Sequence, residues 1–429
     1  MNKTAIKNFA IEARKKLISE ITYRAGLVGI TKDGIAEPIH KANGIEMYNI
    51  GASERYTIIG EQIKQRKSLA SRVKEKGFDN VIEEVAYTWF NRIIAVRFME
   101  VNDYLPTRVR VLSSETAGKT EPDIVTVAPN IDLGFTSVEI DEILQLKHDN
   151  KLDELFRMLF IKQCNALNII LPELFEKTSD YKELLLSISF TNEESVVRML
   201  VDSIEEDDFK NQVEIIGWMY QYYNTELKDD TFAKLKANVK ITKERIPAAT
   251  QLFTPDWIVR YMVENSLGRL IVDSGQWTVG SSGQWIVDSG QGAVDSRGQW
   301  TVDRVNELKS KWEYYLEEAE QTDEVKHQLS TIHSQLSTDF NIENVKIIDP
   351  CMGSGHILVY AFDLLMDIYK SCGYEEREAA RLIVEENLHG FDIDYRAYQL
   401  AYFAVMMKAR SCNRRILNEN ISHNLSLSY

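Results

Sequence analysis

The segment Val345–His356 constrains the fold of this chain more than any other, because it has the pattern of a strand, a tight turn and a helix start in immediate succession. Its apolar run ends in an acid, Asp349, and the turn that follows contains Gly353 and Gly355. Glycine lets a backbone turn tightly and lets a ligand approach without interference from a Cβ atom. This order predicts a nucleotide-binding crevice at the carboxyl end of a first parallel strand, where Asp349 can accept from a charged amino group.

The residues after the turn have the spacing of a helix that buries one side. Leu358, Ala361, Leu365 and Ile368 fall on one helical face. Leu358 also stands where the dinucleotide-binding fingerprint needs a third glycine, and the turn lacks the Gly-Lys-Ser/Thr end of a phosphate loop. The sequence therefore favours neither NAD nor ATP as the ligand of this turn.

A second short apolar run, Leu388–Asp392, also ends in an acid. An acid at the tip of the second strand is placed to bind the two hydroxyls of a ribose. Asp392 comes 43 residues after Asp349, which exceeds the usual interval, and a predicted helix at Tyr374–Asn387 accounts for the excess. Taken alone, such an acid is typical of a solvated surface, but its place after the glycine turn favours the ribose role.

A third segment, Thr250–Trp257, precedes another helical pattern. Thr254 and Pro255 are suited to begin that helix, with Thr254 as the N-cap and Pro255 at the first helical position. Capping explains the threonine but gives no reason for the apolar Phe253 beside it.

The chain as a whole is predicted to be α + α/β, with helices in the N-terminal part and the opening of a parallel sheet near the other end. Helical spacing is clearest in residues 81–101, whose apolar surface is wider than one stripe and predicts a helix buried on most sides. The expected segments are a helical domain at 1–110, a mostly helical region at 111–245, the helix-start segment at 246–271, a repeat at 272–303, a charged linker helix at 304–340 and a partial α/β domain at 341–429.

Residues 272–303 differ from the rest because a fifteen-residue unit, beginning Val-Asp-Ser-Gly-Gln, is used twice. Two units are too few to build a stable solenoid. We interpret the segment as a low-complexity loop inserted between two better-defined elements.

The charge of the chain is unevenly distributed. The formal net charge is −15, yet residues 1–76 hold fifteen Lys and Arg against eight Asp and Glu. Such an excess is more typical of a solvated surface than of a site for nucleic-acid phosphates, and the second interpretation stays open. The aromatic residues of the segment 218–223 are interpreted as core in preference to a base-stacking platform.

The sequence carries no sign of export, membrane insertion or metal binding. No apolar stretch is long enough to span a membrane, and the N-terminus lacks the pattern of a secretory signal. The four cysteines are far apart and show neither metal-ligand spacing nor a disulfide framework, which predicts a reducing cytoplasm. We expect no bound metal and no membrane partner.

Together, three blocks resemble a known family: DPCMGSGHILVYAFD, the strand around Asp392, and TQLFTPDWIVRYMVENSLG. They resemble the cofactor motifs of gamma-type methyltransferases that act on adenine N6 in DNA, and in particular the PglX-type methyltransferases of bacterial BREX phage-defence systems. The segment YTWFNRIIAVRFMEVNDYLP is similar to the helical N-terminal segment of those proteins. The resemblance covers most of the chain outside the repeat.

The resemblance implies a Rossmann-like fold that binds S-adenosylmethionine. By position in the family's motifs, Phe253 and Thr254 would contact the methionine end of the cofactor. Asp349 and the turn would contact its amino and carboxylate region, and Asp392 its ribose. The turn residues concerned are Pro350, Gly353, Ser354 and Gly355. The implied partners are double-stranded DNA and other phage-defence proteins.

The sequence departs from the family in one respect that bears on catalysis. Adenine N6 transfer needs an Asn-Pro-Pro-Tyr motif or a close variant, which accepts from the exocyclic amine and stacks on the flipped base. None of the eight prolines here follows an asparagine. We therefore expect this chain to contain no catalytic residues. A target-recognition region is also missing from the sequence, and we expect a truncated portion of such an enzyme, inactive alone. We expect the missing strands to leave apolar helix faces such as Tyr398–Met407 uncovered.

Three other interpretations remain open at this stage. A non-catalytic fragment could dock onto partner defence proteins, and an unrelated methyltransferase acting on RNA, protein or small molecules would keep the first two motifs. A nuclease site is suggested only weakly by Asp123 and the segment Asp180–Lys182, because their separation is long and the second element lies in a helical pattern.

Overall fold

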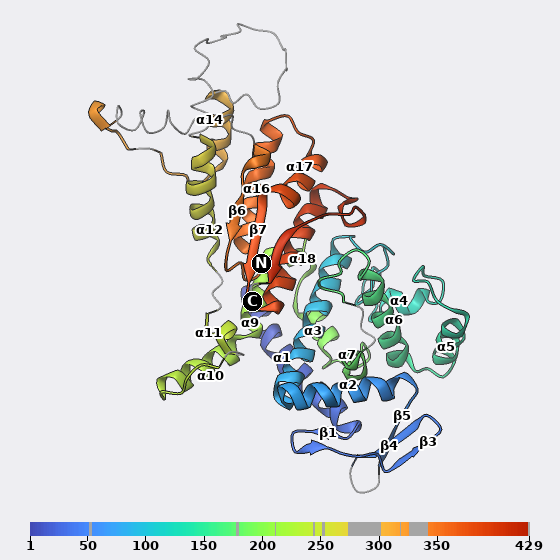
Figure 1. Cartoon of the computed structure of the whole chain (residues 1–429). Coiled ribbons are helices and arrows are strands. Elements are labelled where there is room, and N and C mark those ends of the chain that lie inside the picture. The colour runs from blue at the N-terminus through green and yellow to red at the C-terminus, as the bar shows by residue number, and fades with distance from the viewer. Residues whose placement is uncertain are drawn as a thin grey trace. The chain divides into compact units, whose positions relative to one another are not determined.

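The computed structural model describes residues 1–50, 54–176, 180–210, 212–242, 245–250, 254–272, 302–317, 319–325 and 342–427. The chain forms two compact units, Met1–Gln251 and Leu252–Tyr429 (Figure 1). None of the described helices is long and apolar enough to cross a membrane.

Unit 1 is built around helix α3 (Phe78–Val101). The sequence predicts a helix buried on most sides here, and the structure confirms it, since Trp89, Ile93 and Phe98 are all 1% exposed or less. Helix α1 (Lys3–Leu27) packs against α3 along a stripe of buried residues spaced three or four apart. The side chain of Asn2 accepts from the backbone N–H of Ala5 and so caps the start of α1.

Further helices pack around this pair. They are α2 (Glu61–Lys76), α4 (Asp123–Val127), α5 (Ser137–His148), α6 (Leu152–Leu167), α7 (Tyr181–Leu185), α8 (Val196–Ser203), α9 (Glu214–Tyr223), α10 (Thr225–Lys236) and α11 (Ile246–Thr250). In α9 the expected aromatic core is confirmed for Tyr220 and Tyr223, which are buried. Trp218 and Tyr222 are half-buried and stack on each other, with Lys3 Nζ 4.1 Å from the Trp218 ring centroid.

The expectation that residues 1–110 are helical throughout is wrong for residues 30–59. Five short antiparallel strands occupy this stretch: β1 (Ile30–Thr31), β2 (Gly34–Ile35), β3 (His40–Ala42), β4 (Ile45–Asn49) and β5 (Arg55–Ile59). The turn between β3 and β4 is Asn43-Gly44, with φ of 48° and 76°. Two positive φ values in a two-residue loop match the twist of the paired strands, and Asn-Gly is the preferred sequence for such a turn.

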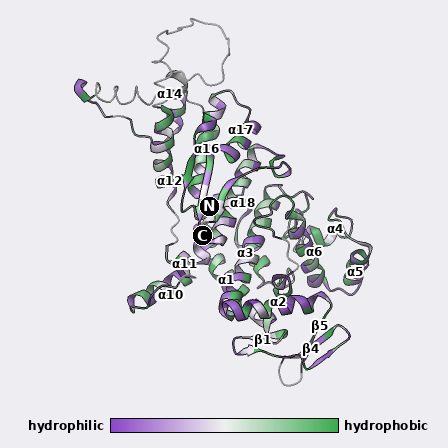
Figure 2. Cartoon of the chain, viewed as in Figure 1, coloured by the Kyte–Doolittle hydropathy of each residue, from purple (hydrophilic) through white to green (hydrophobic). Residues whose placement is uncertain are grey.

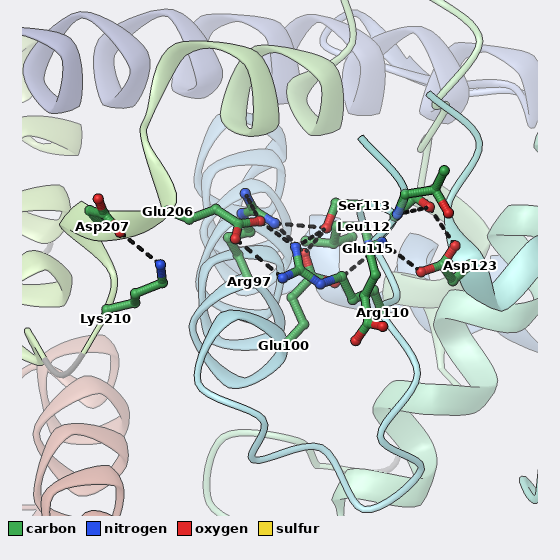
Figure 3. A network of polar contacts seen from close by, with 12 residues as sticks. Arg97, Glu100, Arg110, Leu112, Ser113, Glu115, Asp123, Glu206, Asp207 and Lys210 are labelled. Atoms are coloured by element: carbon green, nitrogen blue, oxygen red, sulfur yellow. Dashed lines mark hydrogen bonds and ion pairs between the residues drawn. The ribbon is translucent and has the colours of Figure 1, made fainter. Parts of the chain in front are cut away.

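A buried polar network fastens the loop after α3 to the rest of unit 1 (Figure 3). Glu100 is 6% exposed; its carboxylate accepts from Arg97 and from the backbone N–H groups of Val111 and Leu112, at 2.7 to 2.8 Å. Arg97 also donates to Glu206, which pairs in addition with Arg110. Because buried charges are costly unless they are paired, this arrangement favours a single position for the loop.

Unit 2 contains a parallel sheet in the order β6-β7-β8, from strands β6 (Ile347–Asp349), β7 (Leu388–Asp392) and β8 (Asn424–Leu427). Its helical elements are α12 (Asp256–Val263), the π-helical turn η3 (Glu264–Gly268), α14 (Val302–Lys311), α16 (His356–Ser371), α17 (Glu376–Leu382), the π-helical turn η5 (Ile383–Asn387) and α18 (Tyr395–Cys412). A strand, a helix and a parallel strand therefore follow in the predicted order.

The predicted apolar face of α16 is confirmed. Leu358, Ala361, Leu365 and Ile368 are each 0% exposed. The helix predicted before the second strand is also present, as α17 followed by η5.

Two expectations for the C-terminal part are wrong. The charged linker helix was expected over 304–340, but helix α14 ends at Lys311 and residues 312–317 leave the helical path. We also expected apolar residues such as Tyr398–Met407 to lie uncovered for want of further strands. In the structure these residues of α18 are buried, and the helix packs against α16, β7 and β8.

The repeat lies almost entirely outside the described residues, but the segments on its two sides contact each other. Glu264 accepts from the backbone N–H of Tyr314 at 2.6 Å, and Asn265 donates to the backbone carbonyl of Tyr314 at 2.7 Å. A Cβ at Gly268 would lie 3.1 Å from the Trp312 ring, so the indole packs closely on this glycine.

Candidate cofactor site

The first strand, the glycine turn and helix α16 form a continuous strand–turn–helix unit. Asp349 is the last residue of β6 and pairs in register with Gly390 of β7. Its Oδ1 accepts from the backbone N–H of Cys351 at 3.1 Å, which holds the carboxylate over the start of the turn. A Cβ at Gly390 would come within 2.5 Å of Met352 Sδ, so a side chain there would push the turn away from β7.

Two glycines in the turn adopt left-handed backbone conformations. Gly353 has φ of 54° and Gly355 has φ of 79°, a region that costs residues with a Cβ. The two positions differ in their surroundings. A Cβ on Gly355 would lie 3.0 Å from the Cα of Ala401 in α18, whereas a Cβ on Gly353 would have no atom of the described residues within 4 Å. Gly355 is therefore needed for packing, whereas the space beside the Cα of Gly353 is open among the described residues.

Asp392, the last residue of β7, is joined directly to this turn. Its Oδ2 accepts from the backbone N–H of Gly353 at 2.9 Å, and its Oδ1 accepts from the backbone N–H of Asp394 at 2.8 Å. Burial raises the pKa of Asp392, and these backbone donors act in the opposite direction by favouring the charged form. The second acid thus holds the first turn in place while it stands at the strand tip.

Asp349 is 8% exposed, and its buried Oδ2 atom has no hydrogen-bond partner among the described residues. Burial raises the pKa of Asp349, and the nearby charge of Asp392 adds to the increase. A buried acceptor without a donor is costly. The site can therefore stabilise a cationic or hydrogen-bond-donating group that reaches Oδ2.

Helix α12 packs beside α16, and the two are joined by polar contacts. The Arg260 guanidinium lies over the Tyr360 ring, 5.2 Å from its centroid. Glu264 is 0% exposed and accepts from the Tyr360 hydroxyl at 2.6 Å. Arg260 and Tyr360 each come four residues after the first residue of their helices, about one turn in.

Contacts further along show that α12 and α16 run in the same direction. Gly268, beyond the end of α12, packs on Trp312. The adjacent Lys311 forms an ion pair of 3.6 Å with Asp367, near the end of α16. Thr254 and Pro255, which directly precede α12, therefore lie at the same end of α16 as the glycine turn.

The structure brings only some of the predicted site residues together. Asp349, Gly353 and Asp392 are brought together by the contacts above. Ser354 is 8% exposed within the turn, and Pro350 is exposed at its start. Thr254 is half-buried ahead of α12, and Phe253 lies outside the described residues.

The predicted capping role of Thr254 is wrong. The N-cap of α12 is Pro255, no side chain caps the helix, and Asp256 is its first residue. The reason is that Pro255 has ψ of 141°, an extended value that cannot continue into a helix. Thr254 is thus not used by the helix start.

Sequence reasoning missed Glu264, Tyr360 and Gly390. A glutamate at the end of an apolar helix and a tyrosine one turn into another give no local signal of their pairing. Gly390 inside a strand pattern did offer one, because an interior strand glycine often marks a close approach of another segment.

The residues suggested for a nuclease site serve local structure instead. The Asp123 carboxylate accepts from the Ser114 hydroxyl at 2.6 Å, and Asp180 caps α7 by accepting from the backbone N–H of Lys182. Among the described residues, no cluster of His, Cys, Asp and Glu side chains is suited to hold a metal ion.

Comparison with known proteins shows which proteins this chain is related to. The chain is 47% identical over 438 residues to adenine-specific methyltransferase PglX of Lacticaseibacillus casei (strain Zhang), covering 97% of this chain and 33% of the relative. It is 38% identical over 433 residues to adenine-specific methyltransferase BrxX of Escherichia coli O9:H4 (strain HS), covering 99% of this chain and 32% of the relative. The chain is a homologue of PglX and BrxX.

This homology to PglX and BrxX confirms the resemblance found in the sequence and relates the chain to an adenine-specific methyltransferase family. The chain spans about a third of the length of these curated relatives. No protein-family model matches the chain.

Proposed function

We propose that this chain is the S-adenosylmethionine-binding portion of a bacterial DNA adenine-N6 methyltransferase that serves phage defence in the cytoplasm. Two kinds of support converge. The homologues PglX and BrxX are named adenine-specific methyltransferases. The observation that carries the cofactor assignment is the Gly353–Asp392 hydrogen bond, which joins the turn after β6 to the tip of β7 beside the buried Asp349.

The residues present fit S-adenosylmethionine. The cofactor carries an ammonium group, which suits the buried and unpartnered Oδ2 of Asp349. The space beside Gly353, where no described atom would meet a Cβ, leaves room for its methionine end. Asp392 would accept from the ribose hydroxyls, and Thr254 and Phe253 would border the methionine end.

When bound, the cofactor supplies an electrophilic methyl group. This chain's contribution is to bind and orient it: the rigid turn fixes the methionine end, and the two strand tips fix the amino group and the ribose. The chain holds no Asn-Pro sequence to accept from an adenine amine. We therefore propose cofactor binding without methyl transfer by this chain alone.

Calorimetric titration of the purified chain with S-adenosylmethionine tests the proposal. We expect saturable binding that Asp392→Ala weakens. A well-folded chain that binds no cofactor would overturn the assignment. It would support the second candidate, a non-catalytic fragment that docks onto defence-system partners.

A further inference from the structure

One face of helix α2 has a composition that the proposed cofactor site does not explain. Lys64, Lys67, Ser71 and Lys74 are exposed and are spaced three, four and three residues apart. At 3.6 residues per turn they fall within about 80° of arc. We call these four residues the lysine face.

The opposite side of α2 fixes how the helix is turned. Leu69 is 0% exposed, and Arg66 is buried, with its guanidinium donating to the backbone carbonyl of Val28 at 2.7 Å and stacking on Tyr48. Gln65 donates to Glu183 of α7 at 2.9 Å. These contacts hold the lysine face outward, and Figure 2 shows α2 largely in the colour of hydrophilic residues.

The lysines of this face are less neutralised than several basic residues of the N-terminal segment. Arg14 pairs with Glu83, and Lys32 with Asp79, at 2.7 Å each. Within the described part of the chain, Lys67 and Lys74 have no ion-pair partner. Lys64 has only an exposed pair with Glu61, of a kind that contributes little.

The remaining charges near this face do not cancel it. Of the two acids on α2, Glu61 pairs with Lys64 and Glu75 with Arg72. The acidic excess that gives the chain its net charge of −15 lies outside residues 1–76, which hold fifteen Lys and Arg against eight Asp and Glu. At physiological salt, interactions between exposed charges fade beyond about 8 Å, so the local excess governs what this face attracts.

The chemistry of the face favours nucleic-acid phosphate over a membrane surface. Lysine and serine side chains are donors that contact phosphate oxygens without reading sequence. A helix that binds a membrane surface needs an exposed apolar side to insert. The apolar residues of α2 are buried or half-buried, and its exposed positions are polar or charged.

We propose that the lysine face binds the phosphate backbone of duplex DNA, independently of base sequence. The choice of DNA as the nucleic acid rests on the proposed function. The binding is separate from the cofactor site, because no residue of the lysine face takes part in that site. It positions the substrate duplex on unit 1.

The test is fluorescence anisotropy of the whole chain with a short labelled duplex, at salt concentrations from about 50 to 200 mM. In the variant with Lys64→Gln, Lys67→Gln and Lys74→Gln we expect affinity to fall about tenfold or more. The slope of log K against log salt should shrink by about 2.7, because each lost phosphate contact removes about 0.9. The loss should be equal for duplexes of different sequence.

Two matched variants control for charge and fold. Lys151→Gln, Lys210→Gln and Lys234→Gln remove the same charge from exposed lysines that pair with carboxylates, and should leave the slope unchanged. Replacing the three lysines of the face by arginine should preserve binding, since the charge remains.

Several results would overturn the proposal. They are an unchanged salt slope in the first variant, an equal loss in both glutamine variants, or an absence of duplex binding by the unmodified chain. Binding to phosphatidylserine vesicles that the first variant loses, with duplex binding intact, would assign the face to a membrane instead. Cofactor titration of the same variants reports separately on the proposed function, because duplex binding is measured without S-adenosylmethionine.

Discussion

Gly353 donates its backbone N–H to Oδ2 of Asp392 over 2.9 Å, so the turn after the first strand is fastened to the tip of the second. Asp392 therefore has a structural task in addition to its proposed contact with a ribose. Substitutions at this residue have to be designed so that the two roles separate.

Asp392→Ala should lower the free energy of unfolding by about 1–2 kcal/mol, because the backbone N–H groups of Gly353 and Asp394 lose their acceptor. Asp392→Asn keeps one oxygen for Gly353 but none for Asp394, so it should lose only part of this stability. Both variants should bind S-adenosylmethionine at least about tenfold more weakly, since neither can accept from two ribose hydroxyls as the carboxylate can. Thermal unfolding with calorimetric titration checks this. Native affinity in Asp392→Asn would remove the ribose role.

Asp349→Asn should stabilise the protein without ligand and abolish cofactor binding. The folded-state pKa of Asp349 is raised, so its protonated form is favoured on folding. As pH rises from about 4 through the raised pKa, ionisation of Asp349 lowers the free energy of unfolding of the native protein. Asparagine does not ionise, so the variant does not show this decrease. The unfolding temperature of the variant should therefore exceed that of the native protein by an amount that grows across this pH range. A variant less stable than the native protein at neutral pH would contradict the prediction.

The two turn glycines should respond differently to alanine. Gly355→Ala should cost roughly 2–4 kcal/mol, because a left-handed backbone and a contact of 3.0 Å with Ala401 both oppose the Cβ. Gly373→Ala, also at positive φ but in open space, is the matched control and should cost about 1–2 kcal/mol. Gly353→Ala should lower the free energy of unfolding no more than the control does, yet weaken cofactor binding.

Chemical denaturation measures the stability of each variant, and titration with S-adenosylmethionine measures its binding. Unimpaired binding by Gly353→Ala would count against the turn as part of the cofactor site.

Glu264 and Tyr360 should show energetic coupling. Glu264→Ala leaves the Tyr360 hydroxyl and the backbone N–H of Tyr314 without their acceptor and should cost about 2–4 kcal/mol. Burial and the hydrogen bond to Glu264 raise the pKa of Tyr360, so its hydroxyl stays a donor at neutral pH. A double-mutant cycle with Tyr360→Phe should give a coupling of about 1 kcal/mol or more. Additive losses would show that the contact does not hold α12 to α16.

Much of the cofactor site could be predicted from local sequence. The order of apolar run, acid and glycine turn was enough to predict β6, the turn and α16, because strand alternation, helical spacing and positive-φ glycines act over a few residues. The face of α16 that carries Leu358 and Ile368 was confirmed for the same reason.

Elements stabilised mainly by their surroundings were predicted poorly. Strands β3 to β5 have three to five residues each, and their apolar residues are partly exposed, so their pattern is weak against that of the flanking helices. The Asn43-Gly44 turn was their one strong local signal. Helix α14 stops at Lys311 although the charged pattern continues, since Trp312 packs on Gly268 and turns the chain.

The sequence by itself determined which chemistry this chain can offer: two acids at strand tips, a glycine turn and no Asn-Pro motif. It could not determine that Asp392 holds Gly353, that Oδ2 of Asp349 is buried without a donor, or that Glu264 meets Tyr360. Residue type and spacing are local properties, whereas these contacts join residues far apart in the chain. They form only when the parallel strands are in register and the helices have packed, so the tertiary structure determines them.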